Sequence, residues 1–132
     1  MLNPNEIEEL LKKAKDATKH SYAPYSNFHV GAAILTRDNN IYTGTNIENA
    51  SYGLTICAER VAVFKAVSNG EREFKAIVIY AEGEMPYPCG ACRQVLAEFD
   101  NGDMEVIVTN GEKIEKYTLR ELLPKTFQFK RG

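Results

Sequence analysis

The three cysteines of this chain lie in two short motifs, and these motifs constrain the possible folds more than any other feature. Cys57 stands alone, whereas Cys89 and Cys92 form a Cys-x-x-Cys pair, which one loop or helix start can direct at a single metal ion. Three thiolates leave a tetrahedral zinc one ligand short, and an open position is typical of catalytic rather than structural zinc. The fold must therefore bring two distant segments to one point.

Two charged residues follow the first cysteine motif closely. Glu59 stands two residues after Cys57, where its carboxylate could take a proton from water at the open position and deliver it elsewhere. Arg60 could donate a hydrogen bond to a thiolate sulfur and offset the negative charge of three thiolates. Each has an ordinary alternative, Glu59 as a solvated helix residue and Arg60 as a surface ion-pair partner. The open metal position favours catalysis for Glu59, and the residues alone leave Arg60 undecided.

Charge and cysteine content exclude several classes of partner. The net charge of -2 provides no basic surface for a polynucleotide, so we expect no nucleic-acid partner. No apolar run approaches the length of a membrane span, and the N-terminus lacks the pattern of a signal peptide. An odd number of cysteines without a secretory context favours reduced thiols. We therefore expect a cytoplasmic protein that makes no contact with a membrane.

The first half of the chain predicts a helix, a β-hairpin and a second helix. Asn3, Pro4 and Glu6 are typical of a capped helix start, and apolar residues at helical spacing continue the helix to about Lys19. After a loop come two strands joined by a tight turn, and then a helix capped by Thr55: 28–36, 41–47 and 57–69. This second helix is apolar almost all the way round. It therefore needs cover on two sides, from a subunit interface or from loops and other helices.

The second half predicts a parallel pair of strands and then a hairpin. Residues 76–81 form a continuous apolar run, typical of a central strand buried on both faces. The elements that follow are a helix ended by Asn101-Gly102, two strands around the tight turn Asn110-Gly111, and a short helix: 92–99, 104–109, 113–118 and 119–122. A strand, a helix and a strand in succession favour parallel pairing through a right-handed crossover.

Together these elements predict an α/β fold, a three-layer α/β/α sandwich whose mixed sheet has about five strands. Both cysteine-bearing helices begin where strands end, at the sheet edge where open α/β folds bind their ligands. No repeat, linker or low-complexity segment divides the chain, so we expect a single domain over residues 1–132. The topology thus brings the two cysteine motifs to one place.

Five motifs extend the pattern well beyond the cysteines: FHVGAA, NIENASY, CAER, PCGACRQ and ELLP, at 28–33, 46–52, 57–60, 88–94 and 121–124. The pairing of Cys-Ala-Glu with Pro-Cys-x-x-Cys resembles the zinc-dependent nucleoside and nucleobase deaminases, including their three-cysteine variant. The five motifs together resemble the short, single-domain cytidine deaminases, and the resemblance covers nearly the whole chain. The expected fold is therefore cytidine deaminase-like.

The resemblance implies one zinc ion per chain, held by Cys57, Cys89 and Cys92, with water or hydroxide as the fourth ligand. Glu59 would deprotonate this water, protonate N3 of the pyrimidine and pass a proton to the departing ammonia, while the hydroxide attacks C4. The implied reaction converts cytidine or deoxycytidine to uridine or deoxyuridine with release of ammonia, a step of pyrimidine salvage.

The resemblance also implies how the substrate is held. The backbone of Ala58 would orient the base, and Phe28 would pack on its ring. Asn46 and Glu48 would hydrogen-bond a sugar hydroxyl. From the residues alone, Asn46 and Glu48 could equally be turn residues, and Phe28 could belong to the core.

Two more aromatic residues would complete the pockets, Tyr52 and, from a neighbouring subunit, Phe127. Similarity to the short members of the family implies a homotetramer. The expected partners are therefore a small nucleoside substrate and further copies of this chain.

Two other functions stay open. A related deaminase could act on another amino-heterocycle, such as an aminonucleoside antibiotic, although the residues 46–49 favour an ordinary ribose. A zinc-stabilised binding module without activity would need a fourth protein ligand, and the chain has no fourth cysteine. His20 and His29 are expected at a helix end and within a strand, so neither is a good candidate for that ligand.

Overall fold

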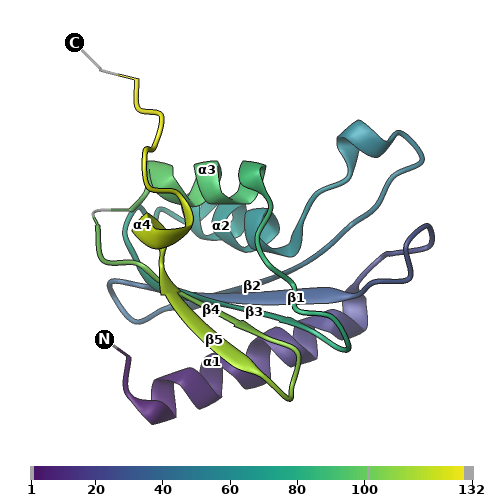
Figure 1. Ribbon diagram of the computed structural model, residues 1–132, viewed down its shortest axis with the longest axis horizontal. Coiled ribbons are helices and arrows are strands. Elements are labelled where there is room, and N and C mark those ends of the chain that lie inside the picture. The colour runs from purple at the N-terminus through teal and green to yellow at the C-terminus, as the bar shows by residue number, and fades with distance from the viewer. Residues whose placement is uncertain (1, 101, 130–132) are drawn as a thin grey trace.

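A mixed sheet of five strands forms the middle layer of the molecule, in the order β2-β1-β3-β4-β5 (Figure 1). The computed structural model describes residues 2–100 and 102–129. The strands are β1 (Val30–Thr36), β2 (Ile41–Thr45), β3 (Phe74–Ala81), β4 (Glu105–Thr109) and β5 (Ile114–Thr118). β3 and β4 pair in parallel, and the other neighbours are antiparallel. All of β1, and all of β3 except Lys75, is buried, as expected for strands covered on both faces.

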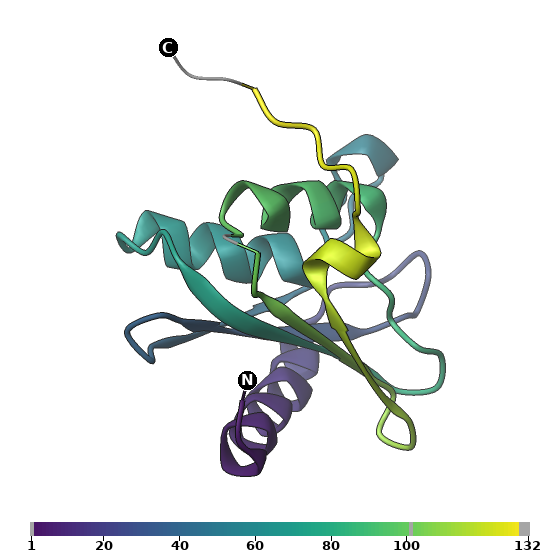
Figure 2. The ribbon, with the colours of Figure 1, turned by 60° about the vertical axis from the view of Figure 1, so that its left-hand side comes forward.

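Helices cover both faces of this sheet, α1 on one and α2, α3 and α4 on the other (Figures 1 and 2). Their bounds, with two short 3-10 helices, are α1 (Pro4–Ala17), η1 (Thr18–His20), η2 (Tyr52–Leu54), α2 (Ala58–Ser68), α3 (Gly90–Glu98) and α4 (Leu119–Leu122). Alternate residues of β1 enter different cores, because successive side chains of a strand point to opposite faces. Ala33 and Leu35 pack in the core under α1, whereas Ala32 and Ile34 pack in the core under α2. The predicted three-layer fold is confirmed.

Among the described residues, no helix combines the length and the apolar character that crossing a bilayer requires.

The strands of the first hairpin are shorter than predicted at the end near the cysteines. The first begins at Val30 rather than at residue 28, and the second ends at Thr45 rather than at residue 47. The cause is Asn46, whose side chain accepts a hydrogen bond from the N–H of Val30 (3.0 Å) and donates one to the carbonyl of Phe28 (2.8 Å). At this end of the hairpin, hydrogen bonds of the Asn46 side-chain amide therefore replace the backbone pairing of the two strands.

The prediction that Thr55 caps α2 is wrong, because the chain is still extended at that point. Ile56 pairs with Ile47 in an isolated β-bridge, and the Thr55 hydroxyl accepts the N–H of Asn49 (3.1 Å). The N-cap is Cys57 itself. The first cysteine therefore lies at the start of the helix rather than inside it.

The third helix begins earlier than its apolar pattern indicates. It starts at Gly90 rather than at Cys92, with Cys89 as its N-cap, and ends at Glu98. Asn101, part of the predicted stop signal, lies outside the described residues. Both cysteine motifs therefore stand at the starts of helices.

A close approach between α2 and the sheet depends on Gly44 of β2. A Cβ at this position would lie 2.4 Å from the carbonyl oxygen of Ala58 and 2.5 Å from the backbone nitrogen of Ala62. Both contacts are with backbone, so the helix would have to move. We expect Gly44→Ala to lower the free energy of unfolding by about 3 kcal/mol, measured by urea denaturation.

Gly53 provides the matched control, because a Cβ there would meet no atom within 4 Å. Gly53→Ala should leave the free energy of unfolding within about 0.5 kcal/mol of the wild type. If Gly44→Ala were equally harmless, α2 would not depend on Gly44 for its place on the sheet.

Candidate active site

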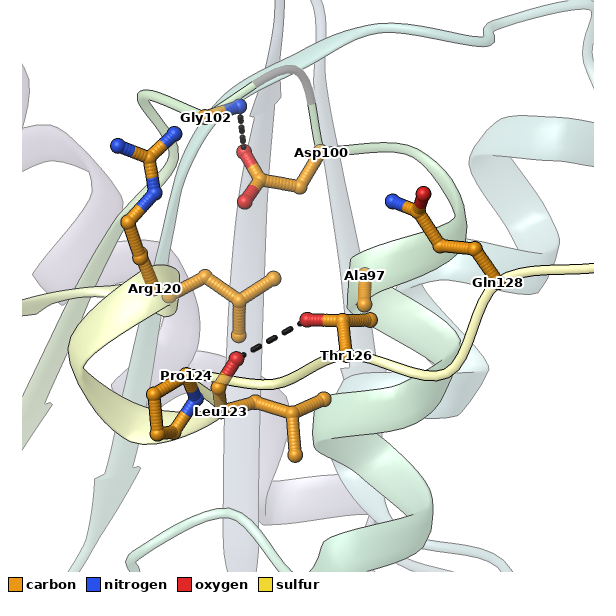
Figure 3. A pocket seen from close by; sticks show the side chains of 9 residues that line it. Ala97, Asp100, Gly102, Arg120, Leu123, Pro124, Thr126 and Gln128 are labelled. Atoms are coloured by element: carbon orange, nitrogen blue, oxygen red, sulfur yellow. Dashed lines mark hydrogen bonds between the residues drawn. The ribbon is translucent and has the colours of Figure 1, made fainter.

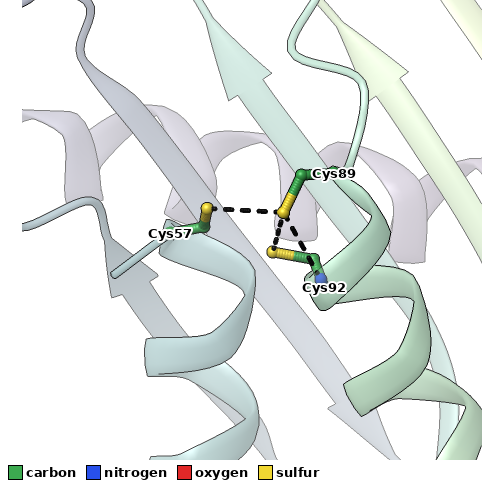
Figure 4. Close-up of side chains that lie close together, drawn as sticks. All are labelled: Cys57, Cys89 and Cys92. Carbon is green, nitrogen blue, oxygen red and sulfur yellow. Dashed lines mark hydrogen bonds between the residues drawn. The ribbon is translucent and has the colours of Figure 1, made fainter. Parts of the chain in front are cut away.

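Three cysteine thiols converge at the starts of α2 and α3 (Figure 4). The sulfur atoms of Cys57 and Cys89 are 3.8 Å apart, and those of Cys89 and Cys92 are 3.4 Å apart. All three sulfurs lie within 4.8 Å of one another, and all three thiols are free. Zn–S bonds of about 2.3 Å in a tetrahedral site place two sulfurs about 3.8 Å apart, so the cluster fits one zinc ion. The positive ends of the two helix dipoles also favour thiolates here.

The thiols of Cys57 and Cys92 differ in how readily they lose a proton. A hydrogen bond from the Cys92 thiol, and then one from Arg60, lowers the pKa of Cys57 to about 5. The same pairing with Cys57, together with burial, raises the pKa of Cys92. Cys57 is therefore ionised at neutral pH, whereas a metal ion must displace the proton of Cys92.

Arg60 lies one helical turn after Cys57 on α2 and contacts its sulfur. Its Nη2 donates to the Cys57 Sγ at 3.5 Å. Its Nε is buried and has no hydrogen-bond partner among the described residues. The positively charged guanidinium of Arg60 therefore lies next to the negatively charged thiolate of Cys57.

We expect Arg60→Ala to lower turnover by about 10–100-fold. Without this positive charge, three thiolates would leave a bound metal ion less able to promote the ionisation of water. Turnover and zinc content should be measured together. The matched control is Arg72→Ala, since Arg72 is exposed and donates to the backbone carbonyls of Val67 and Glu71 instead (both 2.8 Å). Wild-type turnover in Arg60→Ala would contradict a role for Arg60 at the metal.

Glu59 is a buried carboxyl in the first turn of α2, and only 3% of its surface is exposed. Burial, with a contribution from the charge of Cys57, raises its pKa to about 7. A carboxyl with a pKa near neutrality can both accept and release a proton under working conditions. Glu59 can therefore serve as a general acid and base.

A cavity of about 220 Å³ opens beside the cysteines and Glu59. It contains most of the residues that the sequence proposes for the site: Phe28, Asn46, Glu48, Cys57, Ala58, Glu59 and Cys89. Val30, Ile56 and Pro86 give it apolar walls. A small cavity with apolar walls and a few convergent polar groups is the usual form of a ligand site.

Two predicted pocket residues do not line this cavity. Tyr52 lies in η2 with 76% of its surface exposed, and Phe127 lies in the C-terminal segment with 70% exposed. Within one chain, the structure therefore assigns neither of them a place at the site. Arg60 and Cys92 lie at the thiol cluster without lining the cavity.

Two polar residues that line the cavity, Asn46 and Glu48, are held by several hydrogen bonds. The Asn46 side chain, besides its bonds to Val30 and Phe28, accepts a hydrogen bond from the hydroxyl of Ser21 (2.5 Å). The carboxylate of Glu48 accepts from Ser26, whose hydroxyl is the largest cause of the lowered pKa of Glu48. Neither serine was a sequence candidate. Both belong to the loop before β1, where only their nearness in the chain to Phe28 pointed to the site.

A separate cavity of about 330 Å³ lies between α3, α4 and the C-terminal segment (Figure 3). Its one carboxylate, Asp100, already accepts the N–H groups of Gly102 (2.9 Å) and Met104 (3.1 Å). Of its other polar groups, the Thr126 hydroxyl donates to the carbonyl of Leu123 (3.0 Å). It holds none of the candidate residues, so the cavity beside the cysteines is the better candidate for catalysis.

Comparison with known proteins agrees with this geometry. The family described as "Cytidine and deoxycytidylate deaminase zinc-binding region" matches residues 4–109. A cytidine deaminase of Sporosarcina psychrophila is 53% identical over 124 residues, which covers 92% of this chain and 91% of the relative. The crystal structure of cytidine deaminase from Burkholderia pseudomallei has a TM-score of 0.87 at 45% identity and covers 91% of this chain and 98% of that one.

A third relative bears on the antibiotic alternative. Blasticidin-S deaminase of Bacillus cereus is 36% identical over 108 residues, covering 73% of this chain and 74% of the relative. This likeness is weaker and spans less of the chain than the two above. The family match covers a zinc-binding region and the three thiols form a cluster able to hold the ion, so zinc is the cofactor. The chain therefore belongs to the family of cytidine and deoxycytidylate deaminases.

Proposed function

We propose that this chain deaminates cytidine and deoxycytidine by hydrolysis, giving uridine and deoxyuridine with release of ammonia. One observation carries the proposal. The buried Glu59 and two of the three thiols, Cys57 and Cys89, line the same small cavity as Asn46 and Glu48. Groups for proton transfer and groups proposed to bind a sugar therefore face one space. The cytidine deaminase of Sporosarcina psychrophila, 53% identical, supports this substrate class.

The chemistry divides between the zinc ion and Glu59. Zinc held by Cys57, Cys89 and Cys92 would supply a Lewis acid that lowers the pKa of water at the site. The Glu59 carboxylate accepts a proton from the attacking water and delivers it to N3 of the pyrimidine. Once the water oxygen has bonded to C4, Glu59 takes the remaining proton from this oxygen and passes it to the amino nitrogen, which leaves as ammonia when its bond to C4 breaks and the C4 carbonyl forms. A carboxyl with its pKa raised to about 7 suits both directions of transfer.

The remaining cavity residues would orient the nucleoside. Phe28 is partly buried against the core and lines the cavity, where its ring can pack on the base. The backbone of Ala58, next to Glu59, would orient the pyrimidine. Asn46 and Glu48 would bind a hydroxyl of the sugar.

The charges of the cavity favour a nucleoside over a nucleotide. Its described lining contains the carboxyl groups of Glu48 and Glu59 and no lysine or arginine. A phosphate would meet like charge without a positive partner, which costs several kcal/mol. We therefore expect kcat/KM for deoxycytidine monophosphate to lie at least about 100-fold below that for deoxycytidine.

The test follows the change in ultraviolet absorbance as purified enzyme acts on cytidine, deoxycytidine, deoxycytidine monophosphate and blasticidin S. Conversion of the two nucleosides supports the proposal. Conversion of blasticidin S alone would redirect it to aminonucleoside antibiotics, for which the Bacillus cereus relative gives a precedent. Zinc-loaded protein that converts none of them would contradict it and favour a binding module.

The proposal extends to a homotetramer. Several of the exposed large apolar side chains belong to α2, η2 and the C-terminal segment: Phe64, Tyr52, Leu54, Phe127 and Phe129. Apolar surface of this kind is typical of protein interfaces. Neighbouring subunits could then supply Tyr52 and Phe127, which do not line the cavity of their own chain. A monomer with full activity in analytical ultracentrifugation would contradict this assembly.

We further propose that residues 1–132 act as a single cytidine deaminase-like domain in cytoplasmic pyrimidine salvage. Free thiols at the metal cluster, which would be lost to oxidation in a secretory compartment, support a reducing location. Cell fractionation tests the location, and growth of a uracil-requiring host on cytidine tests the role in salvage.

A further inference from the structure

The loop before β1 is joined by backbone hydrogen bonds to the segment that follows β2. The N–H of Tyr22 donates to the carbonyl of Asn46 (3.1 Å), and the N–H of Glu48 donates to the carbonyl of Tyr22 (2.8 Å). These bonds form a parallel bridge between Tyr22 and Ile47. The loop therefore has a fixed position beside the two residues proposed to bind the sugar.

Within the described part of the chain, three hydrogen bonds hold the carboxylate of Glu48, and Ser26 of this loop makes two of them. Its N–H and the N–H of Tyr25 donate to Oε1 at 3.1 and 2.9 Å. Its hydroxyl donates to Oε2. The same hydroxyl oxygen accepts the N–H of Phe28 at 3.1 Å, which leaves its proton directed at Glu48.

These bonds determine which acceptor positions of the Glu48 carboxylate stay available to a ligand. An ionised carboxylate has about four acceptor positions, two on each oxygen. Both positions of Oε1 are taken by backbone N–H groups, and one position of Oε2 is taken by Ser26. The remaining position on Oε2 is the one available to a ligand in the cavity that Glu48 lines.

We propose that Ser26 is a positioning residue for substrate recognition, which fixes the Glu48 carboxylate so that Oε2 accepts a hydrogen bond from a ring hydroxyl of the nucleoside sugar. The inference rests on the proposed function, because it needs a nucleoside in the cavity. Ser26 acts through Glu48 and takes no part in the reaction at C4. Its loss therefore weakens binding of the sugar and leaves the chemical step in place.

The test uses Ser26→Ala with two substrates, cytidine and 2′,3′-dideoxycytidine, which lacks both ring hydroxyls. For cytidine, KM should rise about 10-fold while kcat stays within about twofold, as expected when a hydrogen bond to a charged group is lost. For the dideoxynucleoside, KM should not change, because the hydroxyl that Glu48 would hold is absent. Ser26→Thr keeps the hydroxyl and should restore the KM for cytidine.

A double variant separates positioning from a general effect on the loop. If Ser26 acts only through Glu48, adding Ser26→Ala to Glu48→Ala should raise KM no further. Ser68→Ala is the matched control. The Ser68 hydroxyl donates to the carbonyl of Lys65 at the other end of α2, so this variant should behave as the wild type.

The outcomes distinguish this inference from the proposed function. Wild-type enzyme that does not convert cytidine overturns both. With an active wild type, an unchanged KM in Ser26→Ala overturns the role of Ser26 alone. An equal rise for both substrates, or additive effects with Glu48→Ala, also overturns it, because either result would point to a general disturbance of the loop.

Discussion

Glu59→Gln is expected to lower kcat for cytidine by about 10⁴-fold while leaving zinc content and fold intact. Glutamine has nearly the same shape as glutamate and cannot take up the proton that the reaction must move. The site is otherwise preserved, because position 59 does not belong to the thiol cluster. The measurement is the loss of cytidine absorbance at saturating substrate, with metal analysis on the same sample.

Stability helps to separate a catalytic defect from a folding defect. Only 3% of the Glu59 surface is exposed, and burial raises the pKa of its carboxyl, which means that the ionised form is unfavourable there. The neutral amide avoids this cost, so the free energy of unfolding of Glu59→Gln should equal or exceed that of the wild type above pH 7.

The matched control for this variant is Glu98→Gln, at an exposed glutamate in α3. It should keep wild-type kcat and KM. A Glu59→Gln enzyme that retained more than about a tenth of wild-type kcat would contradict the role of Glu59 in proton transfer.

The thiol cluster was predictable because each of its two motifs can be recognised from residues that are neighbours in the sequence. Cys89 and Cys92 are close in the chain, and each motif stands where a helix follows an extended segment. The buried strand β3 was equally clear, because a continuous apolar run bounded by polar residues has few other uses in a small α/β domain. The sequence therefore placed both motifs at the same sheet edge, and the sulfurs lie within 4.8 Å of one another.

Contacts between side chains that are far apart in the sequence could not be predicted from the sequence. Nothing in the serine-containing loop indicates that the Ser26 hydroxyl reaches Glu48, because that contact depends on the bridge between Tyr22 and Ile47. Hydrogen bonds of the Asn46 side chain make β1 and β2 shorter than predicted, and strand propensities do not take such bonds into account. The residues alone also left Arg60 undecided, and its contact with the Cys57 sulfur comes from the helical geometry of α2.

Removal of zinc with a chelator is expected to abolish deamination and to lower the apparent Tm by about 10 °C, with both effects reversed by added zinc. The ion would bind the folded thiol cluster and not the unfolded chain, so its loss removes binding free energy from the folded state. Magnesium should restore neither, because it prefers oxygen ligands. Activity and thermal unfolding are measured on the same samples under reducing conditions, since the sulfurs of Cys89 and Cys92 are only 3.4 Å apart and could form a disulfide.

Cys92→Ala distinguishes loss of the metal from damage by the chelator. Cys92 is fully buried, so the smaller apolar alanine can occupy its place without exposing a polar group. The variant should match the chelated wild type in activity and should not respond to added zinc, because two thiols remain where the site needs three. Chelated wild-type protein that still converted cytidine at the full rate would show that the thiol cluster has no part in the reaction. Recovery of Cys92→Ala with zinc would instead show that Cys57 and Cys89 suffice to hold the ion.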